Sequence, residues 1–402
     1  MAGCMEGIKI IELGHVVAVP SAAAILADWG ADVIKVEAPG VGDQTRGMTH
    51  LEGGKVSNGI HYMFEVMNRN KRSITLNLKN EQGKEIMYEM VKQADVFVSN
   101  FQPNALTTLG MDYEVLSQLN PRLIYATITG YGEKGPKKDK PGYDYAAFWA
   151  YSGMMDKFSD PNGLPRRQRP GFGDNITSIC IVSGISAALF GRERTGQGQR
   201  ISFSLYNTAM WALQDDIQVA LCTGEELPYG NIKKTRNPLW NAYQTRDGYW
   251  LELCMLQSNL FWPRFCHATG LAQLEHDPRF ESHQKREENC EVLITIINEA
   301  FSRKPADEWE KILEANDLFY ARVQTVKEVV KDRQAIDNDF FMDFDHPTVG
   351  PIKLVASPVL FNGERPPIKL MAPQLGQHTE EVLLEFGYNW EDIALLRDGG
   401  AI

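Results

Sequence analysis

One acidic residue is the strongest candidate for chemistry, because it precedes an apolar segment directly. The stretch "PGFGDNITS" places Asp174 after Gly171 and Gly173 and just before the apolar run "ICIVSGISAALF". Burying a carboxylate is costly unless another group pairs with it or a reaction requires it. The residues alone leave a chemical and a structural interpretation open: Asp174 is a nucleophile, or it caps the helix that the apolar run predicts or lines a turn.

Two further candidates follow predicted strands. His15 comes after "IKIIEL", and Asn100 with Phe101 follows "DVFVS". Open α/β sheets bind ligands at the carboxyl ends of their strands, so these residues are candidates for a ligand site. The alternatives are a core or capping histidine and an asparagine that stabilises a turn.

The basic stretch "MNRNKRS" is the densest cluster of positive charge beside a strand. Its Lys71 and Arg72 suit the phosphates of an anionic ligand. The alternative is a solvated charged face. A literal GxGxxG match over residues 130–135 is followed by Pro136 and Pro141 rather than by an apolar helix, so we reject a dinucleotide site there.

Composition narrows the class of protein. The chain has 402 residues and a net charge of -11, which argues against nucleic acid as the main partner. The six cysteines are scattered without a CxxC pair, so neither a disulfide framework nor a metal site is expected. We see no secretory signal and no apolar run of membrane-spanning length, and the expected location is the cytoplasm, away from membranes.

Alternating strand and helix patterns fill the first half of the chain. Strands are predicted at 8–13, 31–37, 72–78, 95–100, 122–132 and 200–205, and helices at 19–30, 81–94, 113–120 and 178–194. Such alternation is typical of parallel βαβ units, so we expect an α/β fold with a doubly wound sheet. Ser21 is predicted to cap the first helix, Gly30 to end it, and Thr379 to cap a C-terminal helix.

The domain organisation is predicted from changes in residue composition and in strand and helix patterns along the chain. A large Rossmann-like domain is expected from residues 1–200 and 351–402, with a smaller α+β domain at 227–322. Linkers are expected at 201–226 and 323–350.

Several stretches, taken together and in order, resemble the class III CoA-transferase family, of the CaiB/BaiF type. They span nearly the whole chain and include "GIKIIELGHVVAVPSAAAILADWGADVIKVEAPG", "NRNKRSITLNLK", "ADVFVSNFQPNALTTLGM", "GFGDN", "RTGQGQRISFSL" and "APQLGQHTEEVL". "ITGYGEKGP" followed by "PGYDYAAFWA" is similar to the branch that acts on 2-hydroxy acids such as phenyllactate or 2-hydroxyisocaproate in amino-acid fermentation.

The resemblance implies a covalent mechanism and a set of site residues. Asp174 is the implied nucleophile, passing through an acyl–aspartyl anhydride and an aspartyl-CoA thioester. Coenzyme A and acyl-CoA are then substrates, a small carboxylic acid is the second substrate, and no tightly bound cofactor is expected. The positions implied to bind CoA are His15, Val17, Ala18, Lys71, Arg72, Leu76, Lys79, Asn100, Phe101, Tyr143 and Asp144.

The resemblance also carries a quaternary expectation and a departure. It implies an interlaced, ring-like homodimer and a parallel sheet made from both chain ends. Ala38 and Thr108 stand where the formyl-CoA:oxalate members use arginines, so phosphate binding falls to other cations such as Lys140. Aromatic residues such as Phe148 and Trp149 favour a bulky acid substrate, although they also suit an ordinary core.

Two rival functions remain open. The same family includes α-methylacyl-CoA racemases, which need a histidine where this chain has Tyr143. A tyrosine of ordinary pKa, near 10, is a poor proton shuttle at neutral pH, and this favours the transferase. The second rival is a non-catalytic CoA-binding accessory subunit.

Overall fold

The computed structural model describes residues 3–48, 50–51, 54–55, 61–160 and 163–402. The chain divides into two compact units. The first comprises Met1–Lys157, Pro165–Leu227 and Ile336–Ile402, and the second comprises Phe158–Leu164 and Pro228–Ala335. The first unit is therefore built from both chain ends.

A six-stranded sheet forms the centre of the first unit, and all of its neighbouring strands run parallel, as predicted. The expectation that both chain ends supply strands is wrong, because all six lie within residues 9–204. In spatial order they are β5 (Arg72–Thr75), β2 (Asp32–Glu37), β1 (Lys9–Leu13), β6 (Val96–Ser99), β7 (Ile124–Thr129) and β8 (Gln199–Ser204).

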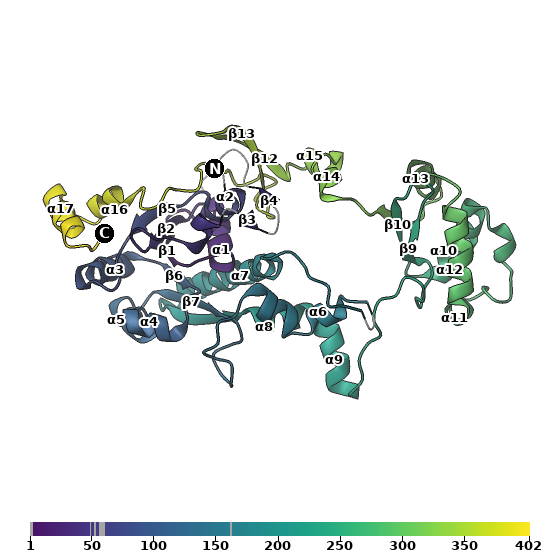
Figure 1. The fold of residues 1–402 in the computed structure, drawn as a ribbon, viewed down its shortest axis with the longest axis horizontal. Helices are drawn as coiled ribbons and strands as arrows, with labels where there is room; N and C mark the ends of the chain where they lie inside the picture. Colours follow the sequence, from purple (N-terminus) through teal and green to yellow (C-terminus); the bar gives the residue numbers. More distant parts are fainter. Residues whose placement is uncertain (1–2, 49, 52–53, 56–60, 161–162) are drawn as a thin grey trace. The chain divides into compact units, whose positions relative to one another are not determined.

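Helices cover both faces of this sheet, because its strands are apolar on both sides (Figure 1). Ile10 packs with α1 (Ala18–Asp28) and α7 (Phe172–Thr195), while its neighbour Ile11 packs on the other face with α3 (Glu81–Gln93). The C-terminal segment adds α16 (Thr379–Glu385) and α17 (Trp390–Asp398) to the α3 face, so it contributes helices rather than strands.

Three helices begin away from the predicted residues. Helix α1 starts at Ala18 with Val17 as N-cap, so Ser21 lies inside it, although Gly30 ends it as expected with φ at 107°. Thr379 is the first residue of α16 rather than its cap, and its hydroxyl accepts the N–H of Thr75. Helix α7 starts at Phe172, six residues before the predicted Ser178.

The early start of α7 decides the setting of Asp174. Gly171 has a left-handed backbone with φ at 85°, which glycine adopts without strain and which turns the chain into the helix. Asp174 is consequently in the first helical turn rather than in the loop before it. By length and composition α7 could cross a membrane, so the expectation that no apolar run is long enough is wrong; 44% of its apolar window is buried inside the protein.

The second unit is α+β. Its sheet is antiparallel in the order β11 (Tyr320–Arg322), β10 (Trp250–Cys254), β9 (Trp240–Gln244). Helices α10 (Ser258–Thr269), α12 (Cys290–Phe301) and α13 (Ala306–Ala315) complete its core. The short elements there are η3 (Ala272–Leu274), α11 (His283–Glu288) and α14 (Val326–Val329), and α15 (Arg333–Asp337) spans the boundary between the units.

The remaining elements belong to the first unit. Residues 201–226, expected as a linker, hold most of β8 and two helices, α8 (Leu205–Ala212) and α9 (Gln214–Thr223). The others are η1 (Gln44–Gly47), β3 (His50–Leu51), β4 (Gly54–Lys55), α2 (Tyr62–Asn68), α4 (Pro103–Leu109), α5 (Tyr113–Leu119), the π-helix η2 (Asp144–Ala150), α6 (Met154–Lys157), β12 (Phe341–His346) and β13 (Gly350–Val355).

Candidate functional site

A cleft of about 300 Å³ opens where β1 and β6 end and where α1 and α7 begin. The chain leaves β1 toward β2 and later returns to place β6 on the other side of β1, so this is the topological switch point of the sheet. The cleft brings together seven of the predicted site residues: His15, Val17, Ala18, Asn100, Phe101, Tyr143 and Asp174.

Asp174 is the buried carboxyl group of the cleft. Its residue is only 9% exposed. Loss of hydration raises the pKa of Asp174 to about 7, and the nearby charge of Asp144 adds to the effect. Near neutral pH the group therefore exists in both forms, and its carboxylate is poorly solvated, which makes it a stronger nucleophile than an exposed one.

Asp144 has a structural role beside the cleft, and its contact with CoA stays a prediction. It does not line the cleft; its Oδ2 accepts the backbone N–H of Gly171 at 2.9 Å. Burial raises the pKa of Asp144 as well. It therefore anchors the start of α7, the turn that carries Asp174, and supplies the like charge that Asp174 senses.

The loop after β1 is fixed by a reciprocal pair of hydrogen bonds. The N–H of His15 donates to Asn100 Oδ1 at 3.0 Å, and Asn100 Nδ2 donates to the carbonyl of His15 at 2.7 Å. The His15 ring stacks on Phe101 with centroids 4.8 Å apart. Burial lowers the pKa of His15, so the imidazole is neutral at physiological pH. Its ring offers a flat, uncharged wall to a ligand.

Lys71 does not bind a phosphate as predicted, because it is fully buried and already paired. Its ammonium lies 2.7 Å from Glu12 Oε2 and donates to the carbonyls of Pro20 and Met67. Burial lowers the pKa of Lys71 to about 8. Arg72 fails for a related reason, since its guanidinium is shared among three carboxylates, those of Asp32, Glu381 and Glu385.

The two remaining predicted residues lie outside the cleft. Leu76 is 1% exposed in the core beneath α3, so it offers no surface to CoA. Lys79 is exposed in the turn before α3 and does not line the cleft, and its role stays a prediction. Sequence reasoning missed Gln44 and Thr129, which do line it; Thr129 ends β7, a position that the strand pattern could have indicated.

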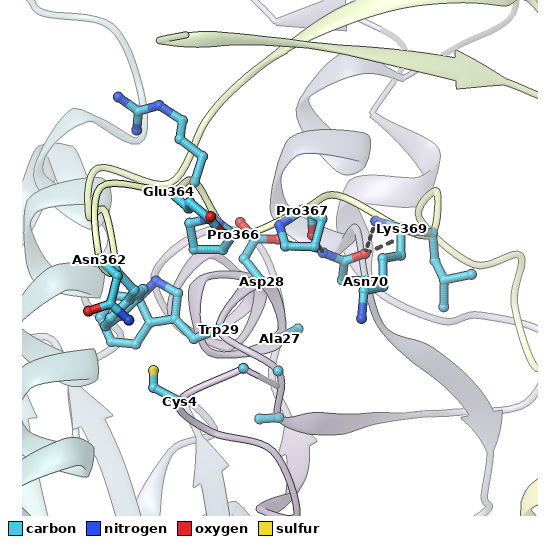
Figure 2. Close-up of a pocket in the computed structure, with 16 residues that line it drawn as sticks. Cys4, Ala27, Asp28, Trp29, Asn70, Asn362, Glu364, Pro366, Pro367 and Lys369 are labelled. Carbon is cyan, nitrogen blue, oxygen red and sulfur yellow. Dashed lines mark hydrogen bonds between the residues drawn. The ribbon is translucent and has the colours of Figure 1, made fainter. Parts of the chain in front are cut away.

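A larger cavity, of about 750 Å³, lies at the opposite end of α1, between its last turn and residues 361–370 (Figure 2). Two polar side chains that line it, those of Asp28 and Asn70, are already bonded within the chain. Asp28 pairs with Arg69 at 2.7 Å, and Asn70 Oδ1 accepts the N–H groups of Lys369 and Leu370. The cleft with Asp174 is therefore the better candidate for chemistry.

A parallel α/β sheet with a cleft at its switch point places the chain in the open α/β class, which binds its ligands at that point. The family model for CoA-transferase family III matches residues 5–379, and the chain belongs to that family. The names of its relatives identify it as a transferase. Acyl-CoA and carboxylic acid substrates are consistent with membership of this family.

Two curated relatives cover almost the entire chain. The (R)-2-hydroxy-4-methylpentanoate CoA-transferase of Clostridioides difficile is 35% identical over 99% of this chain and 99% of its own length. The cinnamoyl-CoA:phenyllactate CoA-transferase of Clostridium sporogenes is 36% identical over 96% of this chain and 94% of its own length. Among solved structures, a CAIB/BAIF family protein from Brucella suis has a TM-score of 0.82, at 28% identity over 96% of this chain and 100% of that one.

Proposed function

We propose that this chain moves coenzyme A from an acyl-CoA donor to a 2-hydroxy acid, with Asp174 as the nucleophile. The observation that carries the proposal is the buried carboxyl group of Asp174 at the head of α7, facing a cleft at the sheet switch point. The names of the two relatives support 2-hydroxy acids as the acceptor class.

The proposed reaction has four balanced steps. The Asp174 carboxylate attacks the donor thioester carbonyl, giving an acyl–aspartyl anhydride and CoA thiolate. The thiolate attacks the aspartyl carbonyl of the anhydride, releasing the donor acid and leaving an aspartyl-CoA thioester. The acceptor carboxylate attacks that thioester, giving a second anhydride and CoA thiolate. The thiolate then attacks the acceptor's acyl carbonyl, which forms the product thioester and regenerates the Asp174 carboxylate.

Each attack generates an oxyanion, and the start of α1 supplies a means to stabilise it. The first N–H groups of a helix have no partner within the helix, and the local field there is positive. Val17 and Ala18, at the start of the 11-residue helix α1, line the same cleft as Asp174. Removing a single donor from a known oxyanion hole costs about 2.7–4 kcal/mol.

The phosphates of CoA need cations other than Lys71 and Arg72. The loop that ends at the cleft-lining residues Pro141 and Gly142 carries Lys140, which is exposed. We propose Lys140, together with Lys79, as the phosphate contacts. The aromatic residues Phe148 and Trp149 are core residues, 0% and 3% exposed, so they do not support a bulky acid by themselves.

The decisive test is chemical trapping. The protein is incubated with cinnamoyl-CoA, isocaprenoyl-CoA and other donors, then treated with hydroxylamine, and its peptides are weighed. A hydroxamate at Asp174 is expected. Exchange of the donor's α-proton in deuterium oxide without any adduct would instead favour the racemase, and CoA binding with neither reaction would favour the accessory subunit.

The raised pKa of Asp174 predicts a pH profile. Because only the carboxylate attacks, the single-turnover rate of Asp174 acylation should rise about tenfold per pH unit below pH 7 and level off above pH 8. Asp144→Asn removes the like charge and keeps an oxygen for the Gly171 N–H. The pKa of Asp174 should therefore fall, and the acylation rate should rise at lower pH than in the wild type. Rates measured from pH 5 to 9 check both expectations; coincident profiles would show that the charge of Asp144 is not sensed.

The outer surface of the first unit supports a homodimer, which we propose in the interlaced arrangement. Along α7, Phe172, Ile179 and Phe190 are 54%, 53% and 60% exposed, and Trp211 of α8 is 71% exposed. Helix α9 has no buried residue at all. Apolar surfaces of this kind usually mark an interface. Sedimentation equilibrium should give a mass near 90 kDa, about twice the 45.3 kDa of one chain; a monomer at micromolar concentration would contradict the proposal.

A further inference from the structure

Val16 is held in a strained backbone conformation at the edge of the cleft. Its φ is 68°, in the left-handed region, which is a genuine outlier for a β-branched residue and costs about 1–3 kcal/mol. In the described part of the chain, the other non-glycine residues with positive φ are all asparagine or aspartate: Asn70, Asp317, Asp339 and Asn362. Something must therefore hold Val16 in place.

Hydrogen bonds hold the backbone on both sides of this strained residue. The N–H of Val16 donates to Asp43 Oδ1 at 3.2 Å, and the carbonyl of Gly14 accepts from Lys35 Nζ at 2.9 Å. Between them, the N–H and carbonyl of His15 bond the side chain of Asn100. The residues that follow, Val17 and Ala18, line the cleft, so the geometry at Val16 sets where they lie.

Asp43 connects this loop to a second wall of the cleft. Its Oδ1 also accepts from the N–H of Thr45 at 2.9 Å and from the hydroxyl of Thr45 at 2.7 Å. These bonds make Asp43 the N-cap of the turn η1, whose first residue, Gln44, lines the cleft. One carboxylate thus fixes both the loop after β1 and the turn that holds Gln44.

A buried chain of charges holds Asp43 in turn. Lys35 Nζ lies 2.9 Å from Asp43 Oδ2 and 2.7 Å from Glu12 Oε1, and the other oxygen of Glu12 lies 2.7 Å from Lys71. All four side chains are 1% exposed or less. Two carboxylates balance two ammonium groups, so moving any one of them would leave an uncompensated buried charge, which is strongly disfavoured.

We infer that Asp43 is a positioning residue for acyl transfer, which holds Val16 in its left-handed conformation so that the start of α1 meets the thioester. Asp43 does not line the cleft, so it acts on the start of α1 through the backbone of Val16. This inference rests on the proposed function for its kinetic part. Its structural part, the dependence of Val16 on Asp43, holds independently of any reaction.

Asp43→Asn tests the inference because asparagine has one acceptor oxygen where aspartate uses both. The charged Lys35 should claim that oxygen, and the amide NH₂ would then face the N–H groups of Val16 and Thr45. We expect Val16 to relax to a negative φ in the crystal structure of the variant. Single-turnover acylation of Asp174 should fall about 10- to 100-fold, since a misplacement of about 1 Å costs that much.

A double variant separates positioning from general loss of stability. Glycine adopts a positive φ without strain, so in a Val16→Gly background the loop needs no anchor. There, adding Asp43→Asn should lower acylation by no more than about threefold. As a matched control, Asp28→Asn breaks another buried ion pair, with Arg69, at the far end of α1, and should lower thermal stability without changing the acylation rate.

Two results would overturn the inference. One is a crystal structure of Asp43→Asn with Val16 still at positive φ and an unchanged rate. The other is an equal loss of rate in the Val16 and Val16→Gly backgrounds. If the wild-type protein is not acylated by any donor, the proposed function fails, while the crystal structures still decide whether Asp43 holds Val16.

Discussion

Asp174→Asn is expected to abolish covalent CoA transfer, with a loss of at least about 1,000-fold. Every step of the proposed reaction passes through a bond to this carboxyl group, and no other group of the described cleft residues is a buried carboxylate. Removing a nucleophile of this kind generally leaves only the catalysis due to binding and oxyanion stabilisation. The measurement is steady-state transfer together with the hydroxylamine trap, and CoA affinity serves as the control for an intact cleft.

The same variant should lose activity but gain stability, and the gain gives an independent check on the burial of Asp174. The pKa of Asp174 is about 7 in the folded state against 3.8 for an ordinary aspartate, so the folded state binds the proton more tightly than the unfolded state. Stability therefore falls as pH rises from about 4 to 7, by an amount on the order of 1–4 kcal/mol. Relative to wild type, Asp174→Asn should gain melting temperature between pH 4 and pH 8. If the difference in melting temperature between variant and wild type does not change with pH, burial of the Asp174 carboxylate does not destabilise the folded protein.

The sequence predicted the strands that lead to the cleft well, because local patterns determine them. Strands of apolar residues alternating with helices indicated a parallel sheet, and the carboxyl ends of parallel strands meet at one edge. That rule alone brought His15 and Asn100 together, although 85 residues separate them. The residues after β1 and β6 were therefore predictable from strand order and spacing.

The charged residues could not be predicted in the same way, because their partners are distant in sequence. Lys71 and Arg72 have the composition of a phosphate site, yet Lys71 pairs with Glu12 and Arg72 with Asp32. Nothing local distinguishes a buried ion pair from a ligand contact. The bond that anchors α7 to Asp144 could not be predicted for the same reason, since its partner Gly171 is 27 residues away.

The C-terminal segment shows a different limit. Its helical pattern around Thr379 was clear, but whether that segment also completed the sheet depended on which surface remained uncovered. In the structure α3 alone does not cover its face of the sheet, and Val382 and Ile393 pack into that core beside Ile86. The composition of one chain end does not show which part of the sheet remains uncovered by other elements.

Gly173→Ala is expected to lower the rate of CoA transfer about 100-fold, although residue 173 takes no part in the bonds that form and break. A Cβ at position 173 would lie 2.3 Å from Asp144 Oδ1 and 2.3 Å from Phe148 Cγ, both far inside van der Waals contact. Asp144 and Phe148 belong to the π-helix η2, so the start of α7 and η2 would have to separate. Asp174 would move with the helix start. Overpacking of this kind also costs about 1–3 kcal/mol of stability.

Gly191 on the same helix provides the matched control. The nearest atom to a Cβ built there is Gln199 Nε2 at 3.8 Å, so alanine fits. Alanine is preferred to glycine inside a helix by about 0.5–1 kcal/mol, and Gly191→Ala should stabilise the protein slightly and leave transfer unchanged. Opposite signs at positions 173 and 191, measured by melting temperature and transfer rate, would show that close contact with η2, rather than helix propensity, requires glycine beside Asp174. If both variants change melting temperature and transfer rate alike, a methyl group fits at the start of α7. The contact with η2 then does not position the carboxyl group.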